Sequence, residues 1–131
     1  MAAKKVLAVD DESDVLLIVR TALESEGMEV VTASNGPDAL ALAEEARRDL
    51  IVLDIMMPEM DGFEVMNRLK DNEKNSGIPV VMLTGLSERN LIKKALDKGV
   101  RHYVVKPFEF QDFLQVVNQA IGDRETDIFN V

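Results

Sequence analysis

The sequence predicts an α/β fold in which five parallel strands alternate with five helices. Five short apolar segments rich in Val, Ile and Leu recur along the 131 residues. The segments between them place apolar residues three and four positions apart, the spacing of a helix with one buried face. Strands that are apolar throughout are buried on both faces, and their alternation with helices is typical of a parallel sheet.

The first half of the chain contains three of the predicted strands, at 5–9, 29–33 and 50–53. Gly27 follows the first helix, where a left-handed residue commonly ends a helix, and Pro37 suits the first turn of the second helix. The apolar stripe of the first helix contains Val15, Val19, Ala22 and Leu23.

The second half contains strands at 79–83 and 100–105, after a polar loop at 71–77. Ser87 is expected as the N-cap of the fourth helix, and Gly99 follows the end of that helix. The last two helices carry apolar stripes at Leu91, Ile92, Ala95 and Leu96, and at Phe113, Leu114, Val117 and Ile121. Each of these helices can therefore cover one face of the sheet.

Right-handed connections with helices on both faces favour a doubly wound sheet. The flavodoxin-like strand order 2-1-3-4-5 places the first and third strands side by side at the switch point of the sheet. The length suits a single domain over 1–131, with a core at about 4–122 and a short polar tail at 123–131.

The composition argues against several classes of function. The chain has no cysteine, which excludes disulfides, thiol catalysis and cysteine-ligated metals. Its net charge of −9 opposes binding to nucleic acid phosphates and to anionic lipids. The first apolar segment is too short for a signal peptide or a membrane span. We therefore expect a cytoplasmic protein without direct contacts to nucleic acid or membrane.

Acidic residues follow two of the predicted strands. Asp10 and Asp11 come after the first strand and Asp54 after the third, so three carboxylates should meet at the carboxyl edge of the sheet. Such carboxylates repel one another, and Mg²⁺ would stabilise them because it prefers oxygen ligands and often joins carboxylates to a phosphate. Thr84 and Lys106 end the fourth and fifth strands and supply donors for phosphoryl oxygens. This arrangement predicts that Asp54 is a nucleophile that forms an acyl phosphate.

Short motifs stand at these successive strand ends. They are Asp10-Asp11-Glu12, Asp54 followed by Met57-Pro58 and Asp61-Gly62, Thr84-Gly85, and Tyr103-Val104-Val105-Lys106-Pro107-Phe108. In these motifs the chain resembles the receiver domain of bacterial response regulators, the CheY-like superfamily. The resemblance covers about 4–122, and it is specific because separated positions must all fall at strand ends.

The resemblance implies a phosphoacceptor switch of a two-component or phosphorelay system. Asp54 would take a phosphoryl group from a phosphohistidine of a sensor kinase or a phosphotransfer protein. Asp11, Asp54 and the Met56 carbonyl would bind Mg²⁺ directly, or Mn²⁺ in its place, and Asp10 would bind it through a water. A domain of this kind catalyses its own phosphorylation and a slow dephosphorylation, but it is not a turnover enzyme.

The resemblance also implies how the switch responds. Lys106 would contact the phosphoryl group, and Thr84 would move toward it and draw the ring of Tyr103 inward. The surface formed by the fourth helix, the fifth strand and the fifth helix would then change. This surface would control a downstream protein, and the domain would be a monomer or a phosphorylation-dependent dimer. The Lys106–Pro107 peptide bond is expected to be cis.

Three positions carry further expectations. Met56 and Leu86 are apolar where some relatives carry polar side chains that orient water, so we predict a long-lived phosphoryl group. His102 is the only histidine of the chain. We expect it at the surface, because it lacks the partners of a metal or catalytic site.

Three other functions fit parts of the sequence. A phosphohydrolase of the haloacid dehalogenase type uses similar residues, but it needs an acid two positions after its nucleophile, where this chain has Met56. A flavodoxin-like mononucleotide carrier needs a phosphate-binding loop after the first strand, where Asp10 and Asp11 would repel phosphate. A receiver-like interaction module that is never phosphorylated is the main alternative.

Overall fold

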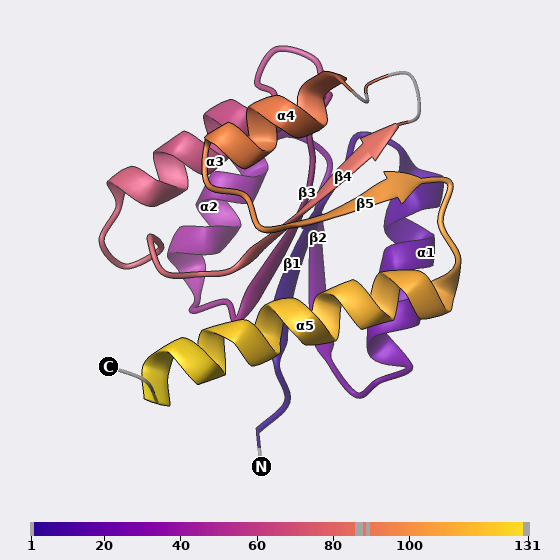
Figure 1. Ribbon diagram of the computed structural model, residues 1–131, viewed down its shortest axis with the longest axis vertical. Helices are drawn as coiled ribbons and strands as arrows, with labels where there is room; N and C mark the ends of the chain where they lie inside the picture. The colour runs from indigo at the N-terminus through magenta and orange to yellow at the C-terminus, as the bar shows by residue number, and fades with distance from the viewer. Residues whose placement is uncertain (1, 86–87, 89, 130–131) are drawn as a thin grey trace.

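A computed structural model of the chain describes residues 2–85, 88 and 90–129. Strands and helices alternate along these residues, as predicted (Figure 1). In chain order they are β1 (Lys5–Val9), α1 (Ser13–Glu24), β2 (Glu29–Ala33), α2 (Gly36–Glu45), β3 (Leu50–Asp54), α3 (Gly62–Asp71), β4 (Val80–Gly85), α4 (Asn90–Asp97), β5 (His102–Lys106) and α5 (Phe110–Phe129).

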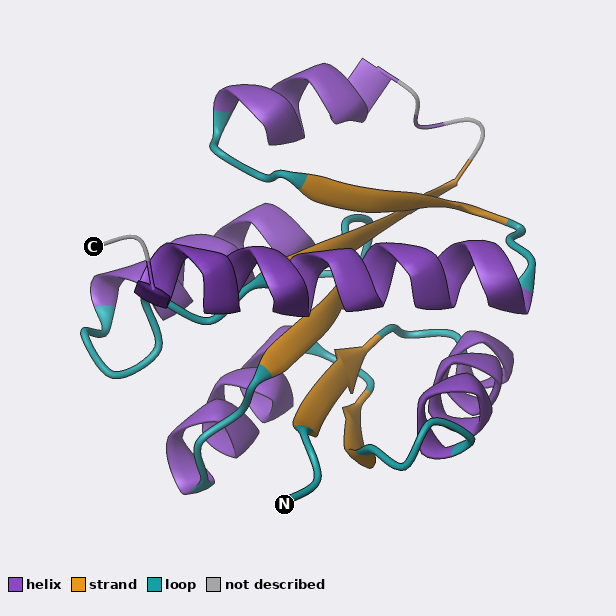
Figure 2. Ribbon diagram, turned by 60° about the horizontal axis from the view of Figure 1, so that its bottom comes forward, coloured by secondary structure: helices purple, strands orange, loops and turns teal. Residues whose placement is uncertain are grey.

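The five strands form one parallel sheet in the order β2-β1-β3-β4-β5, which confirms the predicted topology. Helices cover both of its faces, and the long α5 crosses one of them (Figure 2). One apolar cluster joins the sheet to α2, α3 and α4, and the other joins it to α1 and α5. The central strand β3 is buried along its whole length because both clusters meet on it.

Local backbone chemistry explains several element ends. Gly27 and Gly99 have φ angles of +80° and +91°, which favour glycine, and each follows the helix end predicted for it. Pro37 lies in the first turn of α2, where its missing N–H costs nothing. Ser87, predicted as the N-cap of α4, lies outside the described residues.

The fifth strand begins two residues later than predicted. The Val100 N–H donates to the Ala95 carbonyl at 3.0 Å, so Val100 completes the C-terminal turn of α4 before β5 starts at His102. A valine is common in strands and also in the buried contact that follows a helix end. The residue type at position 100 therefore does not indicate whether it starts β5 or follows α4.

The last helix extends beyond the expected core, because residues 123–129, expected as a short polar tail, belong to α5. The Asp123 carboxylate lies 3.0 Å from Nε2 of His102, at the start of β5. The expectation of a surface histidine without a partner was therefore wrong, because only 12% of the His102 side chain is exposed and it has an acidic partner. Within the described residues, no helix is both long and apolar enough to span a membrane.

Candidate functional site

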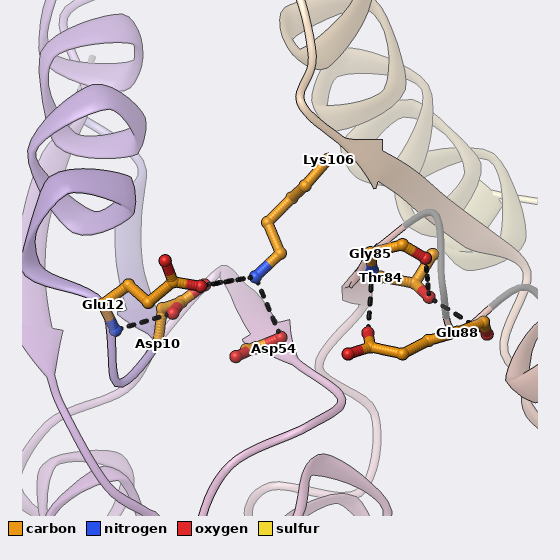
Figure 3. A network of polar contacts seen from close by, with 7 residues as sticks. All are labelled: Asp10, Glu12, Asp54, Thr84, Gly85, Glu88 and Lys106. Carbon is orange, nitrogen blue, oxygen red and sulfur yellow. Dashed lines mark hydrogen bonds and ion pairs between the residues drawn. The ribbon is translucent and has the colours of Figure 1, made fainter.

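The predicted acidic residues meet at the carboxyl edge of the sheet. Asp10 follows β1 and Asp54 ends β3, and the register pairs Val9 with Leu53, so the two aspartates lie on neighbouring strand ends. Their exposed fractions are only 0% and 1%. Figure 3 shows both side chains at this edge together with Lys106.

A close approach of α3 helps to enclose Asp54. The Gly62 N–H donates to the Ile55 carbonyl at 2.8 Å. A Cβ atom at Gly62 would lie 2.3 Å from the backbone oxygen of Asp54, so only glycine allows this approach. The Asp61 carboxylate caps α3 by accepting from the Glu64 N–H at 3.0 Å. The Asp61-Gly62 motif is therefore explained by backbone packing behind Asp54.

Lys106 connects the acidic groups. Its ammonium lies 3.3 Å from an oxygen of Asp10 and 3.3 Å from an oxygen of Asp54, and both distances are within hydrogen-bond range. Glu12 approaches the same ammonium at 3.6 Å from the solvent side. The Lys106–Pro107 peptide bond that follows is cis, as expected. A lysine from β5 thus compensates carboxylates from two other strands.

One ammonium does not fully compensate the two buried aspartates. Burial raises the pKa of Asp54 to about 7, and the Asp10 carboxylate adds to this effect, while Lys106 opposes it. Burial also raises the pKa of Asp10. For Lys106 burial works against the charged form, but the carboxylates of Asp54 and Asp10 outweigh it and raise the pKa. The site therefore carries excess negative potential when all its acids are ionised.

A cation would relieve this excess, and suitable ligands are present. Asp10, Asp11 and Glu12 can bring carboxylate oxygens within 4.8 Å of one another, and Asp11 is exposed to solvent. Hard oxygen donors of this kind fit Mg²⁺. Glu12 was not among the predicted ligands, although its place beside the aspartate pair could have indicated it. The Asp54 carboxylate instead points to Lys106.

Thr84 and Tyr103 occupy the flank formed by β4 and β5. The buried Thr84 hydroxyl has one proton to donate, and its acceptors within reach are the carbonyls of Gly85 and Glu88, at long distances of 3.4 Å and 3.5 Å. Tyr103 remains 37% exposed. The Met56 side chain, two positions after Asp54, is 51% exposed, and Leu86 lies outside the described residues.

Glu88 is a site residue that the sequence did not reveal. Its carboxylate accepts from the Gly85 N–H at 2.8 Å and lies beside Thr84 at the edge of the site (Figure 3). No motif marks this position, because its role depends on how the chain turns after β4.

The chain matches the family model described as response regulator receiver domain over residues 6–118, nearly its whole length. It belongs to this family. Receiver domains are signalling modules of two-component response regulators, so the resemblance seen in the motifs is confirmed. The observed sheet order is that of the CheY-like fold.

Similar proteins agree with this assignment. The chain is 41% identical over 105 residues to the alkaline phosphatase synthesis transcriptional regulatory protein PhoP of Bacillus subtilis, covering 80% of the chain and 43% of PhoP. It is 37% identical over 123 residues to the DNA-binding dual master transcriptional regulator RpaA of Synechocystis, covering 94% of the chain and 50% of RpaA. The receiver domain described here thus spans half or less of the length of these relatives.

A solved structure of similar size matches as well. The chemotaxis response regulator CheY4 of Vibrio cholerae superimposes with a TM-score of 0.84 at 34% identity. The match covers 91% of the chain and 99% of CheY4. A 14.6 kDa protein of Leptolyngbya boryana is 35% identical over 91% of each chain. Receiver domains of this length therefore occur among its relatives.

Proposed function

We propose that this receiver domain is a phosphoacceptor switch in which Asp54 takes a phosphoryl group from a phosphohistidine donor. The observation that carries the proposal is the Lys106 ammonium, which bridges two buried carboxylates, Asp10 and Asp54, at 3.3 Å each. Buried acids that are only partly compensated cost stability, and such groups are typical of functional sites. Phosphoryl transfer depends mainly on positioning and on charge stabilisation, which this edge of the sheet can supply.

In the proposed reaction an oxygen of Asp54 attacks phosphorus, an O–P bond forms, and the P–N bond of the phosphohistidine breaks. The departing imidazole takes up a proton, and Asp54 becomes an acyl phosphate. The attacking oxygen must be ionised, and the raised pKa of Asp54 opposes ionisation at neutral pH when no cation is bound. Asp11, Asp54 and the Met56 carbonyl would hold Mg²⁺ directly, with Asp10 acting through a water. When bound, Mg²⁺ would neutralise charge on these oxygens and on the phosphoryl group.

The signal would pass from Asp54 to the flank formed by α4, β5 and α5. Lys106 would pair with the new phosphoryl oxygens, and Thr84 has only long hydrogen bonds to give up when it turns toward them. Leu96, Tyr103 and Phe110 are exposed apolar side chains on these three elements. A downstream protein or a second copy of the domain would contact this surface, in keeping with a two-state switch.

The phosphoryl group should be long-lived, because the Met56 side chain at the edge of the site cannot orient an attacking water. We expect Met56→Asn to shorten the lifetime of phosphorylated Asp54 several-fold, followed by intact mass after the donor is removed. The double variant Met56→Asn with Leu86→Glu should shorten it further. Equal decay of the variants and the original protein would contradict this part of the proposal.

The proposal is tested by intact mass after incubation with Mg²⁺ and acetyl phosphate. One phosphoryl adduct should form, and it should be absent from the Asp54→Asn variant and from a sample that contains a chelator. A donor phosphotransfer protein charged with phosphohistidine should give the same adduct. If neither donor gives an adduct, a phosphorylation-independent interaction module becomes the better description.

A further inference from the structure

The Glu88 carboxylate turns back onto the end of β4. Its Oε2 atom accepts a hydrogen bond from the Gly85 N–H at 2.8 Å, while the Glu88 carbonyl lies 3.5 Å from the Thr84 hydroxyl. Figure 3 shows the carboxylate on the side of Thr84 that faces Asp54. A negatively charged group therefore occupies a backbone donor next to the proposed phosphoryl site.

Two further observations place this contact on the reacting side of the sheet. The register pairs Gly85 with Lys106 across β4 and β5. Gly85, Glu88 and Lys106 also line one cavity of about 340 Å³, together with residues of α1 and Phe108. Gly85 and Glu88 thus lie beside Lys106, whose ammonium contacts Asp54.

We propose that the Glu88 carboxylate is a built-in competitor of the phosphoryl group, holding the Gly85 N–H in the unphosphorylated domain and leaving it on phosphorylation. This inference rests on the proposed phosphorylation of Asp54. A phosphoryl group there needs donors for its oxygens, and three donors at this edge of the sheet already have partners in the unphosphorylated domain. Lys106 contacts two aspartates, Gly85 contacts Glu88, and the Thr84 hydroxyl contacts backbone carbonyls.

The negative charge of Glu88 opposes a phosphoryl group more strongly than the loss of one hydrogen bond would. A carboxylate and a phosphoryl group at one small site repel each other, and the repulsion is larger in a partly buried place than in water. Because Glu88 is tethered three residues from Gly85, its effective concentration at that N–H is high. The resting contact therefore favours the unphosphorylated form of the β4–α4 region.

The glycine at position 85 fits this arrangement. A Cβ atom there would lie 3.2 Å from Oε2 of Glu88 and 3.4 Å from its Cδ atom, closer than an ordinary contact. Alanine would keep the N–H but crowd the carboxylate. Gly85→Ala is therefore a second way to weaken the contact without changing Glu88 itself.

The test measures how tightly the full chain binds beryllium fluoride, an acyl phosphate analogue, with saturating Mg²⁺, by fluorine NMR or calorimetry. We expect Glu88→Gln to bind it about three- to tenfold more tightly, because glutamine keeps an acceptor for the Gly85 N–H but loses the charge that repels the analogue, and this is the difference between a charged and a neutral hydrogen-bond partner. Glu64→Gln removes the same charge from an exposed residue paired with Arg68, and it should leave the affinity unchanged.

A structural role of Glu88 predicts a different result. The glutamine amide oxygen can still accept from the Gly85 N–H, so a mere loop contact would leave the affinity of Glu88→Gln unchanged, and that result would overturn the inference. Gly85→Ala should tighten binding more in the original protein than in Glu88→Gln, and equal effects in the two backgrounds would also contradict it. If the original protein binds no more beryllium fluoride than Asp54→Asn, which lacks the proposed acceptor carboxylate, the proposed function itself fails.

Discussion

The interior of β3 and its last residue are equally buried but have opposite consequences for the fold. Residues Leu50 to Leu53 are fully covered and contact the two apolar clusters. Asp54 continues the same strand and is just as covered, yet its carboxyl group has a pKa raised to about 7. Burial stabilises the apolar part of the strand and destabilises the charge at its end.

The apolar interior of β3 thus supports the fold of the receiver domain, whereas the charged residue at its end belongs to the candidate site. The apolar strand holds Asp54 in place, so this carboxylate is not positioned by a flexible loop. The charged end has excess negative potential, which a bound cation would relieve. A binding event at the edge is therefore coupled to stability, while a change in the interior should affect stability alone. The following predictions run from the largest expected effect to the smallest.

Lys106→Met removes the only described ammonium that contacts both buried aspartates. Truncating one member of a buried ion pair typically costs about 3–5 kcal/mol, so we expect a loss of this order at pH 8. The loss should be smaller at pH 5, which is below the raised pKa of Asp54, so that this carboxyl group carries a proton. Urea unfolding followed by circular dichroism at both pH values measures the difference, with Lys93→Met on the exposed face of α4 as the control.

Leu53→Ala changes the strand interior one residue before Asp54. The leucine is fully buried, so its truncation should lower the free energy of unfolding by about 2–5 kcal/mol through lost burial and a cavity. Since no charge is involved, the loss should be the same at pH 5 and pH 8 in the same unfolding experiment. A loss of unfolding free energy that depended on pH would contradict the proposed difference between the apolar interior of β3 and its charged end.

Asp54→Asn should stabilise the metal-free domain at pH 8, by about 1–3 kcal/mol, the scale of an uncompensated buried polar group. The carboxyl pKa rises from 3.8 to about 7 on folding, so the folded state binds the proton more tightly. Stability contributed by this group is therefore greatest below the lower value, falls as the pH rises to about 7, and is constant above it. The stabilisation by Asp54→Asn should nearly vanish at pH 4. Equal stabilisation at pH 4 and pH 8 would show that it does not come from the buried charge of Asp54.

Added Mg²⁺ should raise the melting temperature more at pH 8 than at pH 6. Below its pKa Asp54 carries a proton that the metal must displace, so binding weakens as the pH falls through about 7. Thermal unfolding with Mg²⁺ and with a chelator, at several pH values, measures this effect of a few degrees or less. In Asp54→Asn, the rise in melting temperature caused by Mg²⁺ should depend less on pH between pH 6 and pH 8.

The pattern of residues along the chain determined the strands, their order and the edge at which the acids meet. Asp10, Asp54, Thr84 and Lys106 were all predicted at this edge, because parallel strands that alternate with helices must end on the same side of the sheet. Such local periodicity and turn chemistry depend on near neighbours in sequence. The start of β5 at His102 was missed for the same reason, since the valine at position 100 suits both a strand and the turn that follows a helix.

Only the tertiary structure decided which groups contact each other at that edge. The ammonium of Lys106 joins Asp10 and Asp54 across 96 and 52 positions of sequence, and His102 pairs with Asp123 on a helix that continues past the expected core. The turn of Glu88 onto Gly85 likewise has no sequence motif. These contacts depend on side-chain directions and on the packing of distant segments, and composition and spacing do not fix either one.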